Sequence, residues 1–245
     1  YSRNSIFSGL TPYDMKKQHA EFWRGDGDEG LKNEFEFEFL EAQLKRFRLD
    51  INAEYVKISG ANDGEKFLRN IKQYNNNKIT TLVYNFIDML SHARTDSKIM
   101  RELSANDQSY RDITKAWFKN SSLKEIIKAA KQQGLKLIIT TDHGTVEVKR
   151  ASTVIGDKET SLNLRYKTGK SLTFQEKDVY YVPNPSKIGL PNINMSSSFI
   201  FAKYDFLLAY RNNYNHYANY YKNTYQHGGI SMEEMIIPFL IFEPK

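Results

Sequence analysis

The chain contains no cysteine among its 245 residues. This absence excludes disulfide bonds, thiolate metal ligands and a cysteine nucleophile, and it fits a reducing compartment. The sequence also lacks any apolar run near the roughly 20 residues that a membrane-spanning helix needs, and it shows no signal peptide. We therefore predict a cytoplasmic protein that does not interact with a membrane.

The composition is that of an ordinary globular protein, with 40% hydrophobic and 26% charged residues. Basic residues exceed acidic ones by 35 − 29 = 6. Such an excess suits a phosphate-bearing ligand, and it suits an ordinary surface equally well. Internal repeats and a convincing linker are both missing from the sequence, so we predict a single domain over residues 1–245.

Buried strands and helices alternate along the first part of the chain. Apolar and β-branched runs predict strands at residues 53–58, 79–87 and 135–141. Sequence patterns predict helices at residues 1–8, 11–24, 31–48, 63–73, 108–119 and 121–133, with a polar loop at 25–30. The segment at 31–48 could also start as a strand, because its apolar residues partly alternate. This alternation predicts an α/β fold with a largely parallel central sheet flanked by helices.

The pattern changes after residue 144. There we expect an exposed strand at residues 145–155, a short strand at 179–183, a hairpin at 196–210 and a closing strand at 232–244. A basic, turn-rich stretch at residues 163–172 lacks the glycine spacing of a phosphate-binding P-loop.

Histidine is scarce, at five residues, and three of the five stand beside chemically suggestive neighbours. Asp88 and His92 follow a predicted strand at a spacing of four, which places both on one face if that segment is helical. One cation could bind both side chains, because Zn²⁺ and Mn²⁺ both accept oxygen and nitrogen ligands. An acidic helix start followed by a surface histidine would give the same string.

Asp142, His143 and Gly144 follow the predicted strand at 135–141. In open α/β sheets, ligands bind at the carboxyl ends of strands, and glycine lets the backbone turn tightly there. His227 precedes two glycines near the end of the chain. A polar turn and a solvated loop histidine are the alternatives. Together, these residues could hold two cations about 4 Å apart, with a phosphate between them.

This order of motifs resembles the alkaline phosphatase superfamily. Asp-x3-His comes first, then "TDHG" after a strand, then "QHGGISMEEM" near the end. With the opening "YSRNSIFSGLTP", the chain is most similar to PglZ domains, in particular the output domains of PorX-type response regulators linked to type IX secretion. The resemblance covers essentially the whole chain.

The resemblance implies two zinc ions. Asp88, His92 and His227 would bind one ion, and Asp142 and His143 would bind the other. It also implies an additional metal ligand, a first strand of the sheet and a Thr or Ser nucleophile upstream of Tyr1. We therefore expect the chain to be the C-terminal major part of an alkaline-phosphatase-like domain that lacks its N-terminal strand, and to be inactive alone.

Three further residues are candidates for binding substrate. Arg3 and Asn4 lie on the predicted first helix, where the resemblance places the phosphate, although Arg3 could also be a solvated charge. His216 lies among seven tyrosines between residues 204 and 225. Aromatic faces beside cationic side chains can stack on bases. A half-buried tyrosine cluster with hydrated hydroxyls is the alternative.

Two classes of function remain at this point. The first is a zinc-dependent phosphodiesterase or phosphatase acting on cyclic or linear oligonucleotides, with a covalent phosphoryl intermediate. Phosphomonoester or sulfatase-like activity is a variant of it. The second is a signalling or dimerisation module that binds a protein partner, such as a sigma factor or a sensor kinase, without needing catalysis. A homodimer would fit either class.

Overall fold

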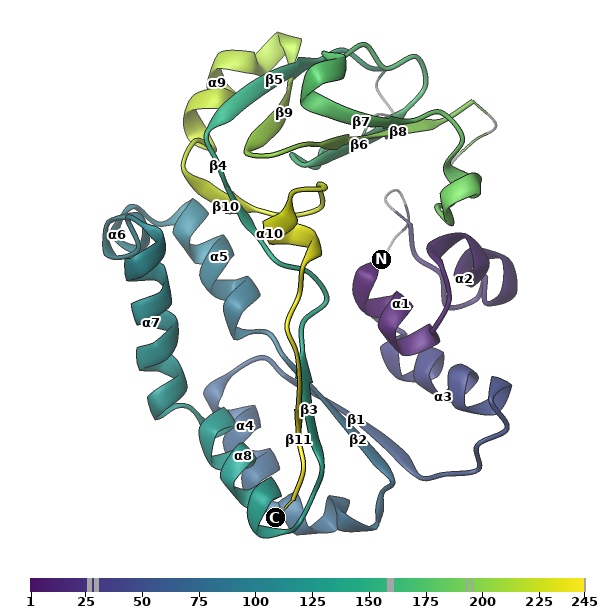
Figure 1. Ribbon diagram of the computed structural model, residues 1–245, viewed down its shortest axis with the longest axis vertical. Helices are drawn as coiled ribbons and strands as arrows, with labels where there is room; N and C mark the ends of the chain where they lie inside the picture. Colours follow the sequence, from purple (N-terminus) through teal and green to yellow (C-terminus); the bar gives the residue numbers. More distant parts are fainter. Residues whose placement is uncertain (26–27, 29–30, 158–160, 193, 195, 245) are drawn as a thin grey trace. The chain divides into compact units, whose positions relative to one another are not determined.

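The computed structural model describes residues 1–245 except 26–27, 29–30, 158–160, 193, 195 and 245, together with the side chain of His92. Figure 1 shows the described chain as a mixture of helices and small sheets. The predicted loop at 25–30 lies largely outside the described residues. Among the described residues, no helix is long and apolar enough to cross a bilayer.

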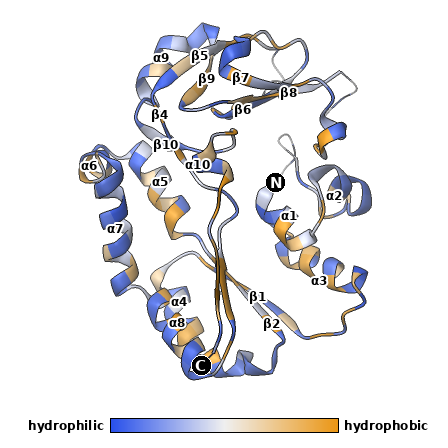
Figure 2. Cartoon of the chain, viewed as in Figure 1, coloured by the Kyte–Doolittle hydropathy of each residue, from blue (hydrophilic) through white to orange (hydrophobic). Residues whose placement is uncertain are grey.

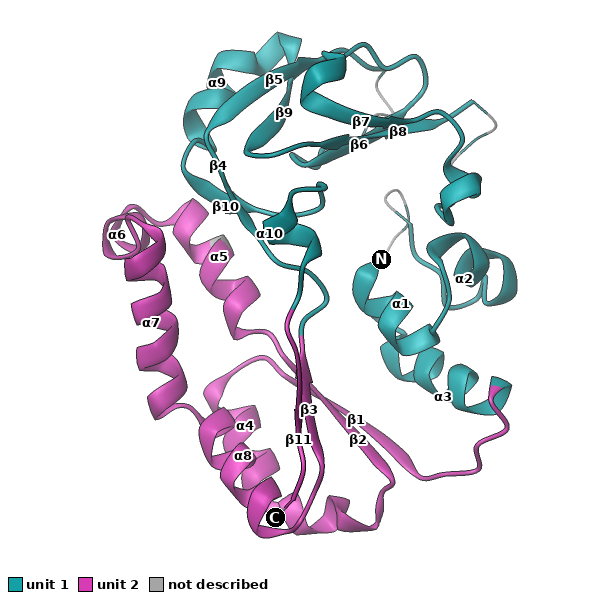
Figure 3. Ribbon diagram, viewed as in Figure 1, with its two compact units in different colours: residues 1–46, 141–237 teal, residues 47–140, 238–245 magenta. Residues whose placement is uncertain are grey.

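The chain divides into two compact units, and each unit is built from two separate stretches of sequence (Figure 3). Unit 1 comprises residues 1–46 and 141–237, and unit 2 comprises residues 47–140 and 238–245. The expectation of a single domain over residues 1–245 stays a prediction. Each unit is described separately below.

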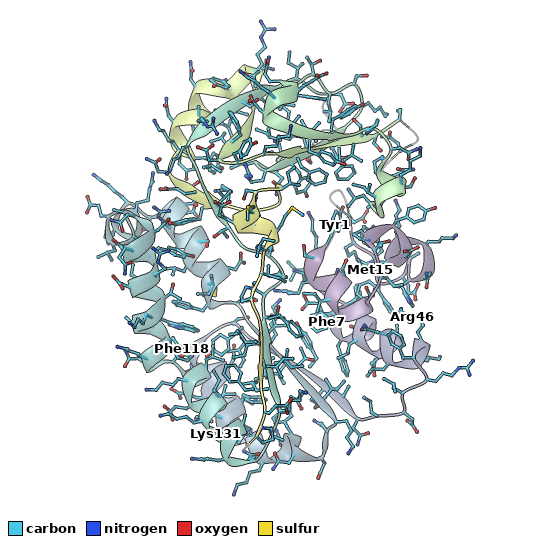
Figure 4. The ribbon with its side chains drawn as sticks, in the orientation of Figure 1. Tyr1, Phe7, Met15, Arg46, Phe118 and Lys131 are labelled. Atoms are coloured by element: carbon cyan, nitrogen blue, oxygen red, sulfur yellow. The ribbon has the colours of Figure 1, made fainter. Side chains whose placement is uncertain are left out.

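Unit 1 begins with three short helices, α1 (Ser2–Ser8), α2 (Pro12–Gln18) and α3 (Glu36–Arg46). Gly9 ends α1 in the left-handed conformation, and the Thr11 hydroxyl caps α2 by accepting from the backbone N–H of Asp14. Both features were expected. The buried side chains of these helices include Phe7 and Met15, which Figure 4 labels.

Two of these helices are shorter than the sequence pattern predicted. α2 ends at Gln18 instead of Arg24, because residues 19–23 turn away from the helix axis and the rings of His19 and Phe22 pack against α3. Phe22, for example, lies 5.9 Å from Phe39 between ring centroids, edge to face. α3 begins at Glu36, five residues after the predicted start.

The rest of unit 1 consists of short strands and helical turns. These are β4 (Val146–Val148), β5 (Arg150–Val154), β6 (Tyr166–Gly169), η2 (Glu176–Asp178), β7 (Val179–Val182), η3 (Pro185–Ile188), β8 (Ser198–Ala202), β9 (Phe206–Tyr210), η4 (Arg211–Asn213), α9 (Tyr214–Tyr220), β10 (Thr224–Gln226) and α10 (Met232–Met235). β6, β8 and β7 form an antiparallel sheet, β10 pairs antiparallel with β4, and β5 pairs parallel with β9.

Two expectations for unit 1 were wrong. The segment expected to be one exposed strand forms two half-buried strands, β4 and β5. Val146, Val148 and Val154 lie in apolar clusters, while Lys149 and Arg150 are exposed. The expected hairpin at 196–210 does not form. Its two strands pair with different neighbours, because β8 fits between β6 and β7 while β9 lies beside β5.

Unit 2 contains β1 (Ala53–Ile58), α4 (Ala61–Arg69), η1 (Ile71–Asn76), β2 (Ile79–Tyr84), α5 (Phe86–Asp96), α6 (Lys98–Leu103), α7 (Asp107–Asn120), α8 (Ser122–Gln132), β3 (Leu137–Thr140) and β11 (Phe239–Phe242). β1 and β2 pair in parallel, and α4 lies between them in the chain, as the alternating pattern predicted. Ile58, Phe67 and Ile126 form the core between this pair and α8.

The strand expected over residues 79–87 ends at Tyr84, and α5 begins at Phe86. The ring of Phe86 stacks on that of Trp117 in α7, with centroids 3.8 Å apart. Phe86 is thus the first residue of a helix that packs against α7, and it is not part of the strand. α6 was not anticipated from the sequence.

β3 pairs antiparallel with β11, and Figure 2 colours both strands as largely hydrophobic. The predicted burial of β3 was wrong, because Ile138 is 51% exposed. The closing segment is also not one strand. Ser231 and Glu234 form a capping box that folds Met232–Met235 into α10 before β11 begins. The sheets of the described residues are small and mixed in direction, so the fold is mixed α/β.

Candidate metal centre

Hydrogen bonds fix the backbone bend at residues 141–144, directly after β3. The Thr141 hydroxyl donates to the backbone oxygen of His143 at 3.1 Å. The backbone N–H of Gly144 donates to the backbone oxygen of Glu234 at 2.9 Å. A Cβ at residue 144 would lie 1.9 Å from the backbone oxygen of Glu233, so only glycine fits here.

This turn presents Asp142 and His143 together, each with 27% of its side chain exposed. Nδ1 of His143 lies 3.0 Å from the backbone oxygen of Gly144. If Nδ1 carries the proton and donates there, Nε2 keeps a lone pair, as in metal-binding histidines. Oδ2 of Asp142 lies 3.6 Å from that Nε2. Two ligands of one tetrahedral zinc ion stand about 3.3 Å apart, so this pair suits one ion.

His227 reaches the same place from the other end of unit 1. It follows β10, and Gly228 continues the chain with φ at 106°, which favours glycine. The rings of His227 and His143 stack with centroids 3.9 Å apart and planes 14° apart. Paired catalytic metal ions also lie about 3.5–4 Å apart. Two parallel rings at this spacing can each offer a nitrogen to a different ion of such a pair.

The structure thus brings together three of the five predicted ligands. Among the described residues, no group of three or more His, Asp or Glu side chains is placed so that it could hold a metal ion. The donor set of unit 1 fits metal chemistry as part of a site that needs further ligands.

Asp88 and His92 lie in unit 2, where α5 places them four residues apart as predicted. Asp88 is exposed in the first turn of that helix. The side chain of His92 lies outside the described residues. Their assignment to a zinc ion stays a prediction.

The predicted phosphate-binding residues on α1 point to other partners. Nε of Arg3 donates to Oε1 of the buried Glu36. Nδ2 of Asn4 donates to the backbone oxygen of Lys32 at 2.8 Å, and Asn4 is itself buried. Arg3 is therefore not the solvated charge that was the alternative. Its role with phosphate, like that of Asn4, stays a prediction.

His216 lies exposed on α9, and its ring stacks on Tyr220 with centroids 5.7 Å apart. Tyr214, Tyr217 and Tyr221 pack against the apolar cluster beneath α9. Part of the tyrosine-rich segment is thus the half-buried cluster of the alternative interpretation, while His216 and Tyr220 lie at the surface.

Sequence reasoning missed the contacts of Glu234 and Arg165. The Oε2 atom of Glu234 accepts from the backbone N–H of Ser231, and its Oε1 atom accepts from that of Gly229. The spacing Ser-x-x-Glu is a capping-box signal that could have been found. The pairing of Glu234 with Arg165, 69 residues away, had no such signal.

A family model described as the BREX system PglZ alkaline phosphatase-like domain matches residues 1–242. No curated protein matches the chain. The match spans both units and includes all five predicted metal ligands. The chain therefore belongs to the PglZ family of alkaline phosphatase-like domains, and its fold is of the phosphoesterase type.

Proposed function

We propose that this chain is the main part of a zinc-dependent phosphodiesterase or phosphatase. The observation that carries the proposal is the arrangement of Asp142, His143 and His227. Two parallel imidazole rings lie 3.9 Å apart, and a carboxylate oxygen lies 3.6 Å from Nε2 of His143. Membership of an alkaline phosphatase-like family supports the same chemistry.

Each residue has a distinct task in this proposal. Asp142 and His143 together bind one zinc ion, and His227 binds a second. The resemblance also assigns Asp88 and His92 to the second ion. Bound zinc would stabilise the negative charge that develops on the phosphate during in-line displacement. The hydrogen bond between Nδ1 of His143 and the Gly144 oxygen holds the ring in its orientation.

The proposed substrates are nucleotide phosphodiesters, cyclic or as short oligonucleotides. The exposed stack of His216 and Tyr220 offers an aromatic face for a base. The basic excess of the chain favours an anionic ligand. The finer resemblance, to output domains of PorX-type response regulators, would place this activity in signalling linked to type IX secretion.

Zinc content, measured by elemental mass spectrometry, tests the metal assignment. We expect the wild-type chain to retain zinc, and the Asp142→Asn and His227→Gln variants each to lose the ion that the replaced residue binds, so that each variant contains less zinc than wild type. His216→Gln is the matched control, because it removes a histidine of the same unit that lies outside the three proposed ligands. A wild-type chain without zinc, or variants that keep the wild-type amount, would refute the assignment.

Hydrolysis tests the enzymatic part of the proposal. The nucleophile is expected upstream of Tyr1, so the assay uses a form extended at its N-terminus. We expect zinc-dependent cleavage of bis(4-nitrophenyl) phosphate that disappears in Asp142→Asn, and we compare it with the monoester 4-nitrophenyl phosphate. An extended, zinc-loaded protein that cleaves neither would favour the signalling or dimerisation module instead.

A further inference from the structure

Arg165 and Glu234 form an ion pair with almost no contact with solvent. Their side chains are 0% and 2% exposed. Nε of Arg165 donates to Oε1 of Glu234 at 2.9 Å, and Nη2 donates to Oε2 at 2.6 Å. Burying two charges in this way seldom increases stability, because both lose their hydration. A buried pair is thus weak evidence for a net gain in stability, and a role in positioning its neighbours has to be considered.

The backbone around Glu234 connects the pair to both histidine loops. Oε1 of Glu234 accepts from the backbone N–H of Gly229 at 2.8 Å, two residues after His227. The backbone oxygen of Glu234 accepts from the N–H of Gly144 at 2.9 Å, next to His143. One residue thus holds both loops whose imidazole rings stack 3.9 Å apart.

Arg165 fixes this assembly to the neighbouring sheet. Its guanidinium group also donates to the backbone oxygens of Ala202, at 3.2 Å, Tyr204, at 2.8 Å, and Phe206. These residues surround the turn between β8 and β9. The packing is close, since a Cβ at Gly229 would lie 2.6 Å from Nη2 of Arg165. The guanidinium group therefore packs directly against the backbone of the His227 loop.

We infer that Arg165 and Glu234 are positioning residues for the metal centre, which hold the His143 and His227 loops in the arrangement that binds zinc. The inference rests on the proposed function for the identity of the ion. It adds a role for two residues that do not bind the ion themselves. Groups that hydrogen-bond directly to a metal-binding side chain typically change the metal affinity 10- to 100-fold when they are replaced. We expect a loss in this range when the two residues that hold the backbone of the histidine loops are replaced.

The test compares Glu234→Gln with Glu233→Gln. Both variants replace an acid by its amide on α10, but Glu233 is exposed. The new amide in Glu234→Gln would place a donor where an oxygen now accepts from Arg165 and a backbone N–H. We expect zinc affinity, measured by competition with a chromogenic chelator, to fall about 10- to 100-fold in Glu234→Gln. Glu233→Gln should bind like wild type.

Amide hydrogen exchange gives a second measurement that needs no metal. We expect the amides of Gly144 and Gly229 to exchange faster in Glu234→Gln than in Glu233→Gln, while those of β6 and β8 stay protected. Melting curves establish that each variant is folded. A folded Glu234→Gln with the zinc affinity and exchange of Glu233→Gln would overturn the inference.

A second variant covers the case in which Glu234→Gln does not fold, since it leaves a buried guanidinium without its carboxylate. Arg165→Met with Glu234→Gln removes both charges. If this double variant binds zinc as wild type does, the inference is wrong; a loss of at least tenfold supports it. A wild-type chain that binds no zinc would refute the proposed function, while hydrogen exchange would still decide whether the pair holds the loops.

Discussion

Lys167 on β6 is a buried lysine whose side chain is only 1% exposed. Its burial makes the unfolding free energy of unit 1 depend on pH in the neutral to alkaline range. Its Nζ atom lies 4.3 Å from the centre of the Tyr210 ring. The cation–π interaction with a ring face is worth about 0.5–2 kcal/mol, which is much less than the hydration free energy that the ammonium group loses on burial. Burial accordingly lowers the pKa of Lys167 from 10.5 to about 7.

The direction of the effect follows from proton binding. Between pH 7 and 10.5, the unfolded chain holds a proton on Lys167 and the folded chain does not, so stability rises with pH in this range. Below pH 7 both states are protonated, and the full penalty applies. At 1.36 kcal/mol for each pKa unit, the shift from 10.5 to about 7 corresponds to a penalty on the order of 5 kcal/mol.

We predict that Lys167→Met stabilises the protein most at low pH. Methionine fills a similar volume without a charge, so its gain in unfolding free energy over wild type should be on the order of 5 kcal/mol at pH 6. The gain should shrink steadily between pH 7 and 10.5. Urea denaturation at a series of pH values measures it.

Lys177→Met is the matched control, because Lys177 is exposed in the same unit. Its effect on the unfolding free energy should be small and independent of pH. A Lys167→Met variant whose difference from wild type does not change between pH 6 and 10 would refute the argument, as would one that is less stable than wild type at pH 6.

Three further predictions concern single side chains. Gly144→Ala should lower the melting temperature and release zinc, because its Cβ would lie 1.9 Å from the Glu233 backbone oxygen; retention of both would contradict the geometry. Trp117→Leu should cost about 1–3 kcal/mol in urea unfolding, since it removes the stack on Phe86 as well as apolar area. Burial raises the pKa of Glu234, but the hydrogen bond and positive charge of Arg165, together with the backbone N–H donors of Gly229 and Ser231, lower it below 4.5. The ionised Glu234 carboxylate should therefore stabilise the folded protein above pH 4.5, and this stabilisation should disappear as the pH falls through the lowered pKa. Comparing the unfolding free energies of wild type and Glu234→Gln between pH 3 and 6 measures it.

Short sequence patterns correctly predicted those helix ends and strands that depend on neighbouring residues in the chain. Gly9 ends α1, Thr11 caps α2, and the β-branched run at Ala53–Ile58 is β1 at the predicted residues. The acid and histidine after residue 140 follow a strand, as expected. In each case, the residues that determine the conformation are close neighbours in the sequence.

Errors arose where a distant partner decides the outcome. β8 and β9 are adjacent in sequence, yet each pairs with strands far away, and no local pattern shows this. Val148 looked like part of an exposed strand because polar residues flank it, but its neighbours in the fold are apolar. The ion pair of Arg165 and Glu234 escaped notice for the same reason.

The hydrogen bonds that connect the histidine loops to Glu234 lie within unit 1. Gly144, Gly229 and Arg165 all bond to Glu234, and all four lie within residues 141–237. Asp88 belongs to unit 2, so its replacement should leave these bonds intact. Loss of zinc in an Asp88 variant would therefore report a missing ligand, whereas loss in a Glu234 variant would report displaced loops. Hydrogen exchange at Gly144 and Gly229 separates the two causes, because only the second should accelerate it.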